Sequence, residues 1–586
     1  MNPLRGDGNL TPEERANLLR VRRYAVPRWM IERATGRRLA GDWRGALAAA
    51  RVRVAFDPAE VAGAYGAAVA GALTADLHHL VPDLVRWHLP RVMGGRSTIA
   101  TGRTVVLAGY GDGPGAGLPR SPYLYVVTPA LQDGPQRLVL CFGPVAGSTP
   151  SGTLPVSADD WRPLRHLWDA RCTAGLRAAA TGGAAGRIPF LDDAGAPYSH
   201  RDPGAPTDDA AARSERVTLL FQDTGTAEAF AEAGVEWDPE PPVTKRRWQS
   251  VDPGSVIRHL APDIPRLEWS VRRWTAVTGT DRFRIGAHWS AHVLLELTDH
   301  ANGGRLRVRT VAKEAAEGLP CLPGPAWQPL PDLRLLRAGA LPARWLHPLV
   351  AGALFPRLEG PFGAPGPTPP APVRVRCRGE WHEVVLRDGV LRSPHSEEER
   401  QREAAMRAFG GAVAGCFAAE HALTSGTGRP PKALRAQRRE LFLRAQHGDT
   451  PGVLEMLDTG MDVRVRGGGR RGLLHLLPLL DHEVLLPRLL AAGLDLEARD
   501  HRHRTPLAAA VGEGGSPALV RALLGAGARI DVVDQSDHSL DQLIRAYRRS
   551  DLGFLRERVE REHPGIGSDW FEEWHDADDD EGHGTQ

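Results

Sequence analysis

Two regions of the chain share one pattern of apolar positions, in which a helical stretch precedes three short runs rich in β-branched and aromatic residues. In the first region the runs are TVVLAGY (residues 104–110), YLYVVTP (123–129) and RLVLCFG (137–143). In the second they are FRIGAHW (283–289), HVLLELT (292–298) and RLRVRTV (305–311). Runs of this composition, separated by glycine, asparagine and aspartate, are typical of strands joined by turns. The pattern predicts three strands in each region.

A short motif precedes each set of strands. It reads HLVPDLVR at residues 79–86 and HLAPDIPR at residues 259–266, with five of eight positions identical. A recurring motif followed by a recurring strand pattern indicates internal repetition. We therefore expect a multidomain protein whose α+β N-terminal body holds two related helix-plus-β-meander modules, residues 61–180 and 216–358.

The segments around these modules differ in composition. Residues 1–60 are predicted to be helical, beginning with a capping box in which Thr11 precedes Pro12 and Glu14. Residues 181–215 are rich in Gly, Ala, Asp and Pro and are expected to form a flexible loop. A proline-rich linker is predicted at 359–372. A β-hairpin plus helix follows at 373–420, the helix capped at Ser396, and a second linker at 421–432.

The C-terminal region, 433–565, carries a helical pattern with a long period. Paired leucines or similar residues precede Gly460, Gly493 and Gly527, and these glycines are 33 and 34 residues apart. A glycine after a helix supplies the positive φ that ends it. Each unit is a helix pair that cannot bury its apolar face alone, so neighbouring units must stack.

The residues of one unit show a resemblance to a known family. Thr505-Pro506-Leu507 followed by three alanines is similar to the TPLHxAA signature of ankyrin repeats, with Ala508 in place of the histidine. Thirty-three residues earlier, the corresponding stretch keeps the histidine, His475, but lacks Thr-Pro. About 120 of the 586 residues resemble this family. The resemblance implies an all-α solenoid of about four repeats, with Thr505, Pro506, Leu507, Gly460, Gly493 and Gly527 as structural positions.

The resemblance also implies a function, because ankyrin repeats bind proteins through their loops, or fingers, and through the adjacent helix face. The first two fingers are basic, which leaves two interpretations: solvated turns in an arginine-rich protein, or a surface for an acidic protein partner. The candidate partner-binding residues are Arg464, Arg466, Arg470, Arg471, Arg499, Arg502 and Arg504.

A tail at 566–586 offers an internal candidate for the same surface. Residues 569–581 contain eight acidic residues and no lysine or arginine, with Trp570, Phe571 and Trp574 between them. Such a segment is expected to contact the basic fingers and to compete there with a partner.

Composition excludes several other classes. A net charge of +2 gives no global reason to expect nucleic-acid binding, although the arginine-rich helices of residues 1–54 leave a DNA-binding alternative open. The sequence shows no uninterrupted apolar run of about 18 residues and no apolar leader, so no membrane partner is expected and a cytoplasmic location is predicted.

The five cysteines include no CxxC pair, and two histidines, His501 and His503, do not by themselves make a metal site. No metal and no cofactor is expected.

Catalytic motifs are absent as well. The glycine-rich stretch at residues 109–115 follows a strand, but another strand follows it where a phosphate-binding loop needs a helix. The sequence has no GxxxxGK[ST], HExxH or GxSxG motif. We therefore expect an adaptor or regulator that binds a protein partner through its repeats. The alternative is an enzyme of unknown class, with unknown catalytic residues, whose α+β body the repeats recruit to protein substrates.

Overall fold

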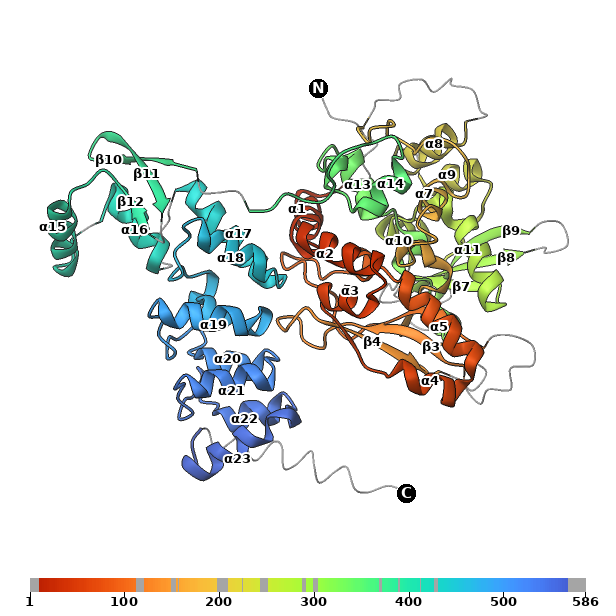
Figure 1. Ribbon diagram of the computed structural model, residues 1–586. Helices are drawn as coiled ribbons and strands as arrows, with labels where there is room; N and C mark the ends of the chain where they lie inside the picture. Colours follow the sequence, from red (N-terminus) through yellow and green to blue (C-terminus); the bar gives the residue numbers. More distant parts are fainter. Residues whose placement is uncertain are drawn as a thin grey trace. The chain divides into compact units, whose positions relative to one another are not determined.

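The computed structural model describes residues 10–111, 121–148, 154–155, 157–197, 209–223, 225–242, 251–286, 291–298, 304–367, 371–387, 390–411, 413–425 and 431–567. These residues form a mixed α/β protein with several small sheets (Figure 1). The chain divides into two compact units. The first comprises Met1–Pro129 and Arg137–Pro365, and the second comprises Ala130–Gln136 and Gly366–Gln586.

The first sheet of unit 1 has five strands in the order β1-β4-β3-β2-β5. They are β1 (Val52–Val54), β2 (Thr104–Gly109), β3 (Tyr123–Val127), β4 (Leu138–Gly143) and β5 (Ala158–Asp160). The central strands β2, β3 and β4 form an antiparallel meander, as their connections predict. The outer strands β1 and β5 run parallel to β4 and β2, respectively.

The second sheet of unit 1 has the order β6-β9-β8-β7. Its strands are β6 (Glu236–Asp238), β7 (Arg282–Ile285), β8 (Ala291–Thr298) and β9 (Arg305–Ala312). Here too the last three strands form an antiparallel meander, and the first strand pairs parallel with the last. A single parallel bridge from Arg284 to Cys321 stands where β5 pairs with β2 in the first sheet. The two sheets thus repeat one strand order and one set of directions.

The helices repeat in the same order. A helix pair precedes each first strand: α2 (Arg28–Leu39) and α3 (Trp43–Ala49) before β1, and α8 (Ala210–Asp223) and α9 (Thr226–Ala233) before β6. A second pair, next to the HLxPD motif, precedes each meander: α5 (Ala67–His79) and α6 (Pro82–His88), then α10 (Pro253–Leu260) and α11 (Ile264–Thr278). The other helical segments of the unit are α1 (Pro12–Arg20), η1 (Val21–Ala25), α4 (Pro58–Tyr65), η2 (Arg162–Leu167), α7 (Gly175–Thr181), η4 (Lys313–Ala316), α12 (Gly324–Trp327), α13 (Pro331–Arg337), η5 (Ala343–Trp345) and α14 (Pro348–Leu354).

One apolar core runs through both modules of unit 1. Its largest side chains include four fully buried tryptophans, Trp87, Trp161, Trp168 and Trp274. The core also encloses charged groups that are paired. Asp332 accepts from Arg22 and from the Trp87 indole, and Asp83 contacts His347 at 2.9 Å. Buried charges of this kind are tolerated only with such partners.

Unit 2 begins with a small sheet of three antiparallel strands, β10 (Val373–Cys377), β11 (Glu380–Arg387) and β12 (Val390–Arg392). Two helices follow, α15 (Glu397–Ala408) and α16 (Gly415–Ser425). The helix α16 packs against β10, whereas α15 buries none of its residues. The Ser396–Glu399 capping box predicted from the sequence is present.

The rest of unit 2 is built from consecutive helix pairs (Figure 1). The pairs are α17 (Lys432–Gln446) with α18 (Thr450–Asp458), η7 (Leu473–Leu479) with α19 (His482–Ala491), α20 (Pro506–Gly512) with α21 (Pro517–Gly525), and α22 (Leu540–Ala546) with α23 (Gly553–Glu562); two short turns are η6 (Gly468–Arg470) and η8 (Ser550–Leu552). Their apolar residues join one continuous cluster.

Several boundaries differ from those expected. Residues 1–60 are not purely helical, because Val52–Val54 joins the first sheet. The single helix expected from Ser396 onward is two helices, α15 and α16, and α16 continues into the linker expected at 421–432. Parts of other predicted segments lie outside the described residues: 198–208 of the loop, 368–370 of the proline-rich linker, 112–115 of the glycine-rich stretch, and 568–586 of the acidic tail.

Candidate partner-binding fingers and a cysteine–histidine cluster

Three turns of unit 2 share a left-handed residue and a closing hydrogen bond at intervals of 33 and 34 residues. Arg470, His503 and Asp537 adopt left-handed conformations, with φ of 58°, 58° and 61°. Each turn is closed by equivalent backbone hydrogen bonds, Gly467 N to Arg471 O, Asp500 N to Arg504 O and Asp534 N to His538 O, of 2.8 to 3.0 Å. The first turn has a second left-handed residue, Gly469, with φ of 70°. We call these related turns the fingers: residues 467–471, 500–504 and 534–538.

Neighbouring fingers are joined through their backbones. The N–H of His501 donates to Gly469 O, and the N–H of Gln535 donates to Arg502 O, each at 2.8 Å. The donors and acceptors occupy similar places in successive fingers. These bonds align the fingers in a row, so that side chains at their tips share one surface.

The helices that precede the three fingers, α18, α19 and α21, share one burial pattern. In each of these three helices, the residues four and seven positions before the glycine (Gly460, Gly493 or Gly527) are buried. The glycines have φ of 107°, 73° and 96°, as the helix-ending role requires. The residues that fill these positions are Met456 and Val453, Leu489 and Leu486, and Leu523 and Val520.

The Thr-Pro-Leu stretch begins α20 as its sequence indicates. The Thr505 hydroxyl accepts from the N–H of Ala508 at 3.3 Å, Pro506 occupies the first turn, and Leu507 is fully buried. One unit earlier, His475 Nδ1 accepts from the N–H of Gly472, and Nε2 donates to Arg504 O at 3.2 Å. Burial lowers the pKa of His475 to about 4, so its ring is neutral and can make both bonds.

The seven predicted arginines fall into two groups. Arg471 and Arg504 turn inward and share the carboxylate of Glu513, and Arg504 also pairs with Asp500 at 2.9 Å. Burial works against the charge of Asp500, but hydrogen bonds from the Arg504 backbone and side chain outweigh it and lower the Asp500 pKa. These two arginines stabilise the fingers. Of the other five, Arg466 is half-buried and bonds Arg470 O, whereas the side chains of Arg464, Arg470, Arg499 and Arg502 are exposed.

A groove lies beside the first two fingers. Its volume is about 320 Å³, and Arg464, Arg466, His475 and Asp495 provide its polar lining. The backbone of Gly493 and the side chain of Leu494 form part of its wall. Two of the predicted partner-binding arginines, Arg464 and Arg466, therefore line this groove.

The two HLxPD motifs of unit 1 have different surroundings. In the first, Asp83 is buried and bonded to His347. In the second, the motif lines an open cavity of about 370 Å³. The polar residues around that cavity include Glu14, Arg258, Arg334 and Arg337.

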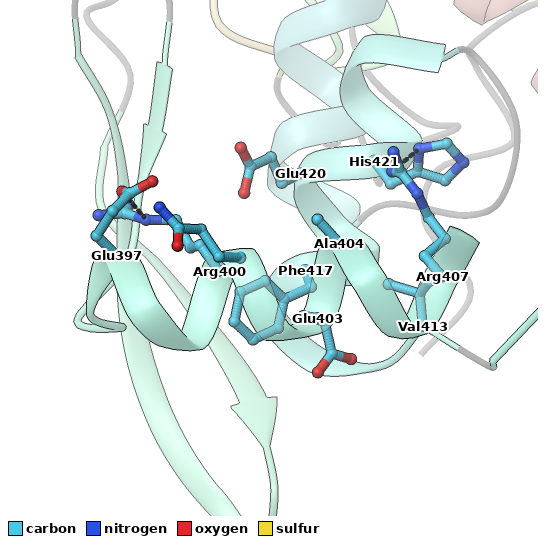
Figure 2. A pocket seen from close by; sticks show the side chains of 10 residues that line it. Glu397, Arg400, Glu403, Ala404, Arg407, Val413, Phe417, Glu420 and His421 are labelled. Atoms are coloured by element: carbon cyan, nitrogen blue, oxygen red, sulfur yellow. Dashed lines mark hydrogen bonds and ion pairs between the residues drawn. The ribbon is translucent and has the colours of Figure 1, made fainter. Parts of the chain in front are cut away.

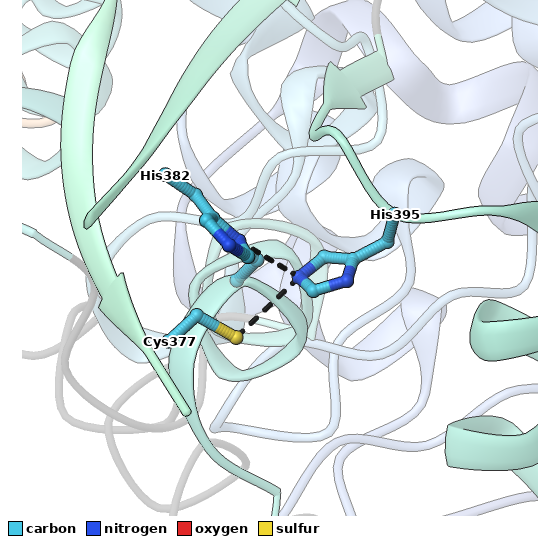
Figure 3. A group of neighbouring side chains, drawn as sticks. Cys377, His382 and His395 are labelled. Carbon is cyan, nitrogen blue, oxygen red and sulfur yellow. Dashed lines mark hydrogen bonds between the residues drawn. The ribbon is translucent and has the colours of Figure 1, made fainter. Parts of the chain in front are cut away.

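Four side chains near the start of unit 2 converge on one point: Cys377, His382, His395 and Cys416. Figure 3 labels the first three. Their ligand atoms all lie within 4.8 Å of one another. Cys377 Sγ is 3.4 Å from His395 Nε2, His382 Nδ1 is 3.1 Å from the same nitrogen, and Cys416 Sγ is 3.6 Å from His382 Nδ1. Two thiols and two imidazoles in this arrangement are the donor set of a tetrahedral zinc site.

Local structure explains why these four side chains meet. Arg378 and Gly379 form a two-residue hairpin turn, both with positive φ, so Val375 lies opposite His382 in the β10–β11 pair. Cys377 and His382 therefore share one face of the hairpin. His395 precedes the first residue of α15 by two positions, and Cys416 lies in the first turn of α16.

Gly415 allows the start of α16 to pack closely against Cys377. It has φ of 60°, and a Cβ at this position would overlap with the Cys377 side chain. Both cysteines and His395 are buried, and burial raises the pKa of the Cys416 thiol to about 12. The cluster is thus enclosed by protein on most sides.

A further hollow lies between α15 and α16, with a volume of about 310 Å³ (Figure 2). Glu397, Arg400, Arg407, Glu420 and His421 contribute its polar lining. Phe417 lines the hollow and also contacts the His395 ring at an interplanar angle of 33°, with centroids 4.6 Å apart. The hollow and the cysteine–histidine cluster therefore lie on neighbouring sides of one aromatic ring.

The sequence prediction of no metal site did not foresee this cluster. The absence of CxxC is uninformative here because the ligand candidates come from a hairpin, a loop and a helix start. The available signal was the turn at Arg378-Gly379, which brings a cysteine and a histidine onto one face. His501, by contrast, bonds the Gly469 carbonyl.

Comparison with models of known protein families gives no match, and comparison with the curated proteins gives none either. In the described part of the chain, no helix combines the length and apolar character needed to cross a lipid bilayer.

Proposed function

We propose that the protein binds a protein partner through the fingers of an ankyrin-repeat stack at residues 433–565. The observation that supports this proposal is the repetition of one left-handed turn at Arg470, His503 and Asp537, with backbone hydrogen bonds from finger to finger. A row of related turns on stacked helix pairs makes an extended surface, and repeat proteins commonly use such surfaces for binding.

The charge of the surface favours an acidic partner. Arg470 and Arg502 are exposed on the first two fingers, Arg499 is exposed directly before the second, and Arg464 and Arg466 line the adjacent groove. Arginine suits such an interface, because its planar guanidinium binds carboxylates with two parallel hydrogen bonds. The acidic residues of the third finger, Asp534 and Asp537, would limit the basic patch to one end of the row.

The test compares two variants that lose the same charge. In the finger variant Arg470, Arg499 and Arg502 become Gln; in the control, Arg556, Arg558 and Arg561 of α23 become Gln. Each full-length protein is used for affinity purification with quantitative mass spectrometry, and enriched candidates are then purified and titrated. A partner should bind the wild type and the control but lose about tenfold or more affinity for the finger variant. If every enriched protein binds the finger variant as well as the control, the proposal fails.

The acidic tail enters the same experiment. We propose that it competes with the partner for the basic fingers, so removal of residues 568–586 should strengthen partner binding at low salt and have less effect at moderate salt. Unchanged affinity at both ionic strengths would remove the tail from this role and leave the finger proposal standing.

A second candidate function, catalysis in the α+β body, is favoured by the cavity at the second HLxPD motif. Its volume of about 370 Å³ falls in the range of small-molecule sites, and it has several charged groups in its lining. A thermal-shift screen of metabolites against the wild type and Arg334→Gln would test it. A ligand that stabilises the wild type but not the variant supports this function, and the absence of any such ligand argues against it.

A further inference from the structure

Three of the six ligand-to-ligand distances in the cysteine–histidine cluster match the edges of a metal-centred tetrahedron. With Zn–S of about 2.3 Å and Zn–N of about 2.0 Å, tetrahedral coordination puts sulfur and nitrogen about 3.5 Å apart and two nitrogens about 3.3 Å apart. The two sulfur–nitrogen distances are 3.4 and 3.6 Å, and the nitrogen–nitrogen distance is 3.1 Å. These three separations fit one ion, and all four ligand atoms lie within 4.8 Å of one another.

The outer nitrogens of both histidines face carboxylates. His395 Nδ1 lies 3.4 Å from Glu399 Oε2, and His382 Nε2 lies 3.9 Å from Glu380 Oε2. A proton on the outer nitrogen leaves the lone pair of the inner nitrogen directed into the cluster. Metal-binding histidines usually have such a carboxylate or carbonyl behind them, because it fixes the tautomer and the ring orientation.

The surrounding fold has little apolar core of its own. Apart from the two cysteines, the buried apolar residues in the described part of the sheet and α16 are few: Val373, Val375, Val384, Leu391, Phe417, Ala419 and Ala422. The helix α15 contributes no buried residue. Small segments with limited cores are commonly stabilised by a structural metal.

We propose that Cys377, His382, His395 and Cys416 bind one structural zinc ion, which fastens the β10–β11–β12 sheet to the start of α16. Four protein ligands fill a tetrahedral shell, so this ion holds structure and has no open position for substrate. The thiolates favour zinc over magnesium or calcium, which prefer oxygen ligands. This site is separate from the fingers, and its test does not depend on the proposed partner.

The first test measures metal in the full-length protein by elemental analysis. The wild type should carry about one zinc per chain, and the double variant Cys377→Ser/Cys416→Ser should carry none. The matched controls are Cys141→Ser, Cys172→Ser and Cys321→Ser, which alter the cysteines outside the cluster and should keep the zinc. Zinc that persists in the double variant would overturn the proposal.

A second measurement needs no variant, so misfolding cannot obscure it. The wild type is stripped with a chelator and reloaded with Co²⁺. A two-thiolate, two-imidazole site should show intense tetrahedral ligand-field bands together with sulfur-to-cobalt charge transfer. Weak octahedral bands would refute the site. An unreduced chain lighter by two hydrogens, with Cys377 joined to Cys416 in a peptide map, would show a disulfide instead and would equally refute it.

Two further readouts test the structural role. Glu399→Gln keeps the capping group for α15 but removes the charge behind His395, and should weaken zinc affinity about 10- to 100-fold, whereas Glu398→Gln should not. Removing zinc should accelerate amide exchange in residues 373–425 and leave α20 and α21 unchanged. Equal exchange with and without metal would refute the fastening role.

Discussion

The guanidinium of Arg22 donates two hydrogen bonds to the carboxylate of Asp332, at 2.6 and 3.0 Å, across 310 positions of sequence. Both side chains are almost completely buried, and the same carboxylate accepts from the Trp87 indole at 3.1 Å. The contact joins η1 at the start of the chain to α13 near the end of unit 1. A buried ion pair therefore connects an early and a late segment of unit 1.

Asp332→Asn should destabilise unit 1 by about 3–5 kcal/mol, because it leaves the Arg22 charge buried without its counterion. Urea unfolding of the full-length protein, followed by tryptophan fluorescence, measures the change. Asp193→Asn is the control, since Asp193 pairs with Arg357 at the exposed surface and should change stability by less than about 1 kcal/mol. Similar effects of the two substitutions would contradict the importance of the buried pair.

The neutral ring of His475 predicts a pH dependence for the helix-pair region. Its folded pKa, about 4, lies below the ordinary value of 6.5, so the unfolded chain binds the proton first as the pH falls. The stabilisation is complete above pH 6.5, declines as the pH falls from 6.5 to about 4, and should lose up to about 3 kcal/mol over that window.

Urea titrations of the wild type and His475→Asn at pH 7 and pH 5, monitored by amide exchange in η7 and α19, measure this term. Histidines elsewhere contribute equally to both proteins, so the difference between them isolates His475. A wild-type profile parallel to that of the variant would contradict the prediction.

Alanine substitutions at two glycines near helix ends should change the stability of the protein in opposite directions. Gly493 has φ of 73° and open space around the position of a Cβ, so Gly493→Ala should cost about 1–2 kcal/mol through backbone strain alone. Gly525 also faces open space but is the last residue of α21 and has no positive φ, so Gly525→Ala should stabilise by about 0.4–1 kcal/mol. Amide exchange of α19 and α21 under increasing urea checks both. Two changes of the same sign would show that these helices do not end as described.

Two glycines beside the proposed zinc site give a steric test. Gly410 and Gly415 both have positive φ, but only at Gly415 would a Cβ overlap with Cys377. Gly415→Ala should therefore lower the zinc content of the purified protein, whereas Gly410→Ala should cost stability and retain the metal. Elemental analysis distinguishes them, and equal zinc contents in both variants would argue against the packing at Gly415.

The sequence revealed those features that depend on local spacing. The interval between Gly460, Gly493 and Gly527 indicated the helix pairs, because each glycine acts on its own helix end. The six strands of the two meanders were also visible as β-branched runs. The three parallel strands β1, β5 and β6 were not: each is three residues long, and β5 and β6 each contain two acids. Such strands are stabilised by a neighbour more than fifty residues away, which no local pattern records.

The candidate sites show the same division. The finger arginines could be named from the sequence, but the inward orientation of Arg471 and Arg504 depends on Glu513, the residue directly after the end of α20. The cysteine–histidine cluster depends on strand pairing and on the break between α15 and α16, because its four members come from a hairpin, a loop and a helix start. The sequence therefore identified individual candidate side chains but not which of them meet in the folded protein.

The parallel pairing of β1 with β4 and of β6 with β9 restricts how this protein can be divided. Each meander ends on a strand whose outer edge is covered by a segment that comes before the helices of the HLxPD motif. A fragment beginning after residue 54, or one beginning after residue 238, would leave a row of backbone amides and carbonyls uncovered and prone to join other chains. Proteolytic separation of either module is therefore expected to yield aggregates unless the cut falls upstream of the helix pair that leads into its first strand.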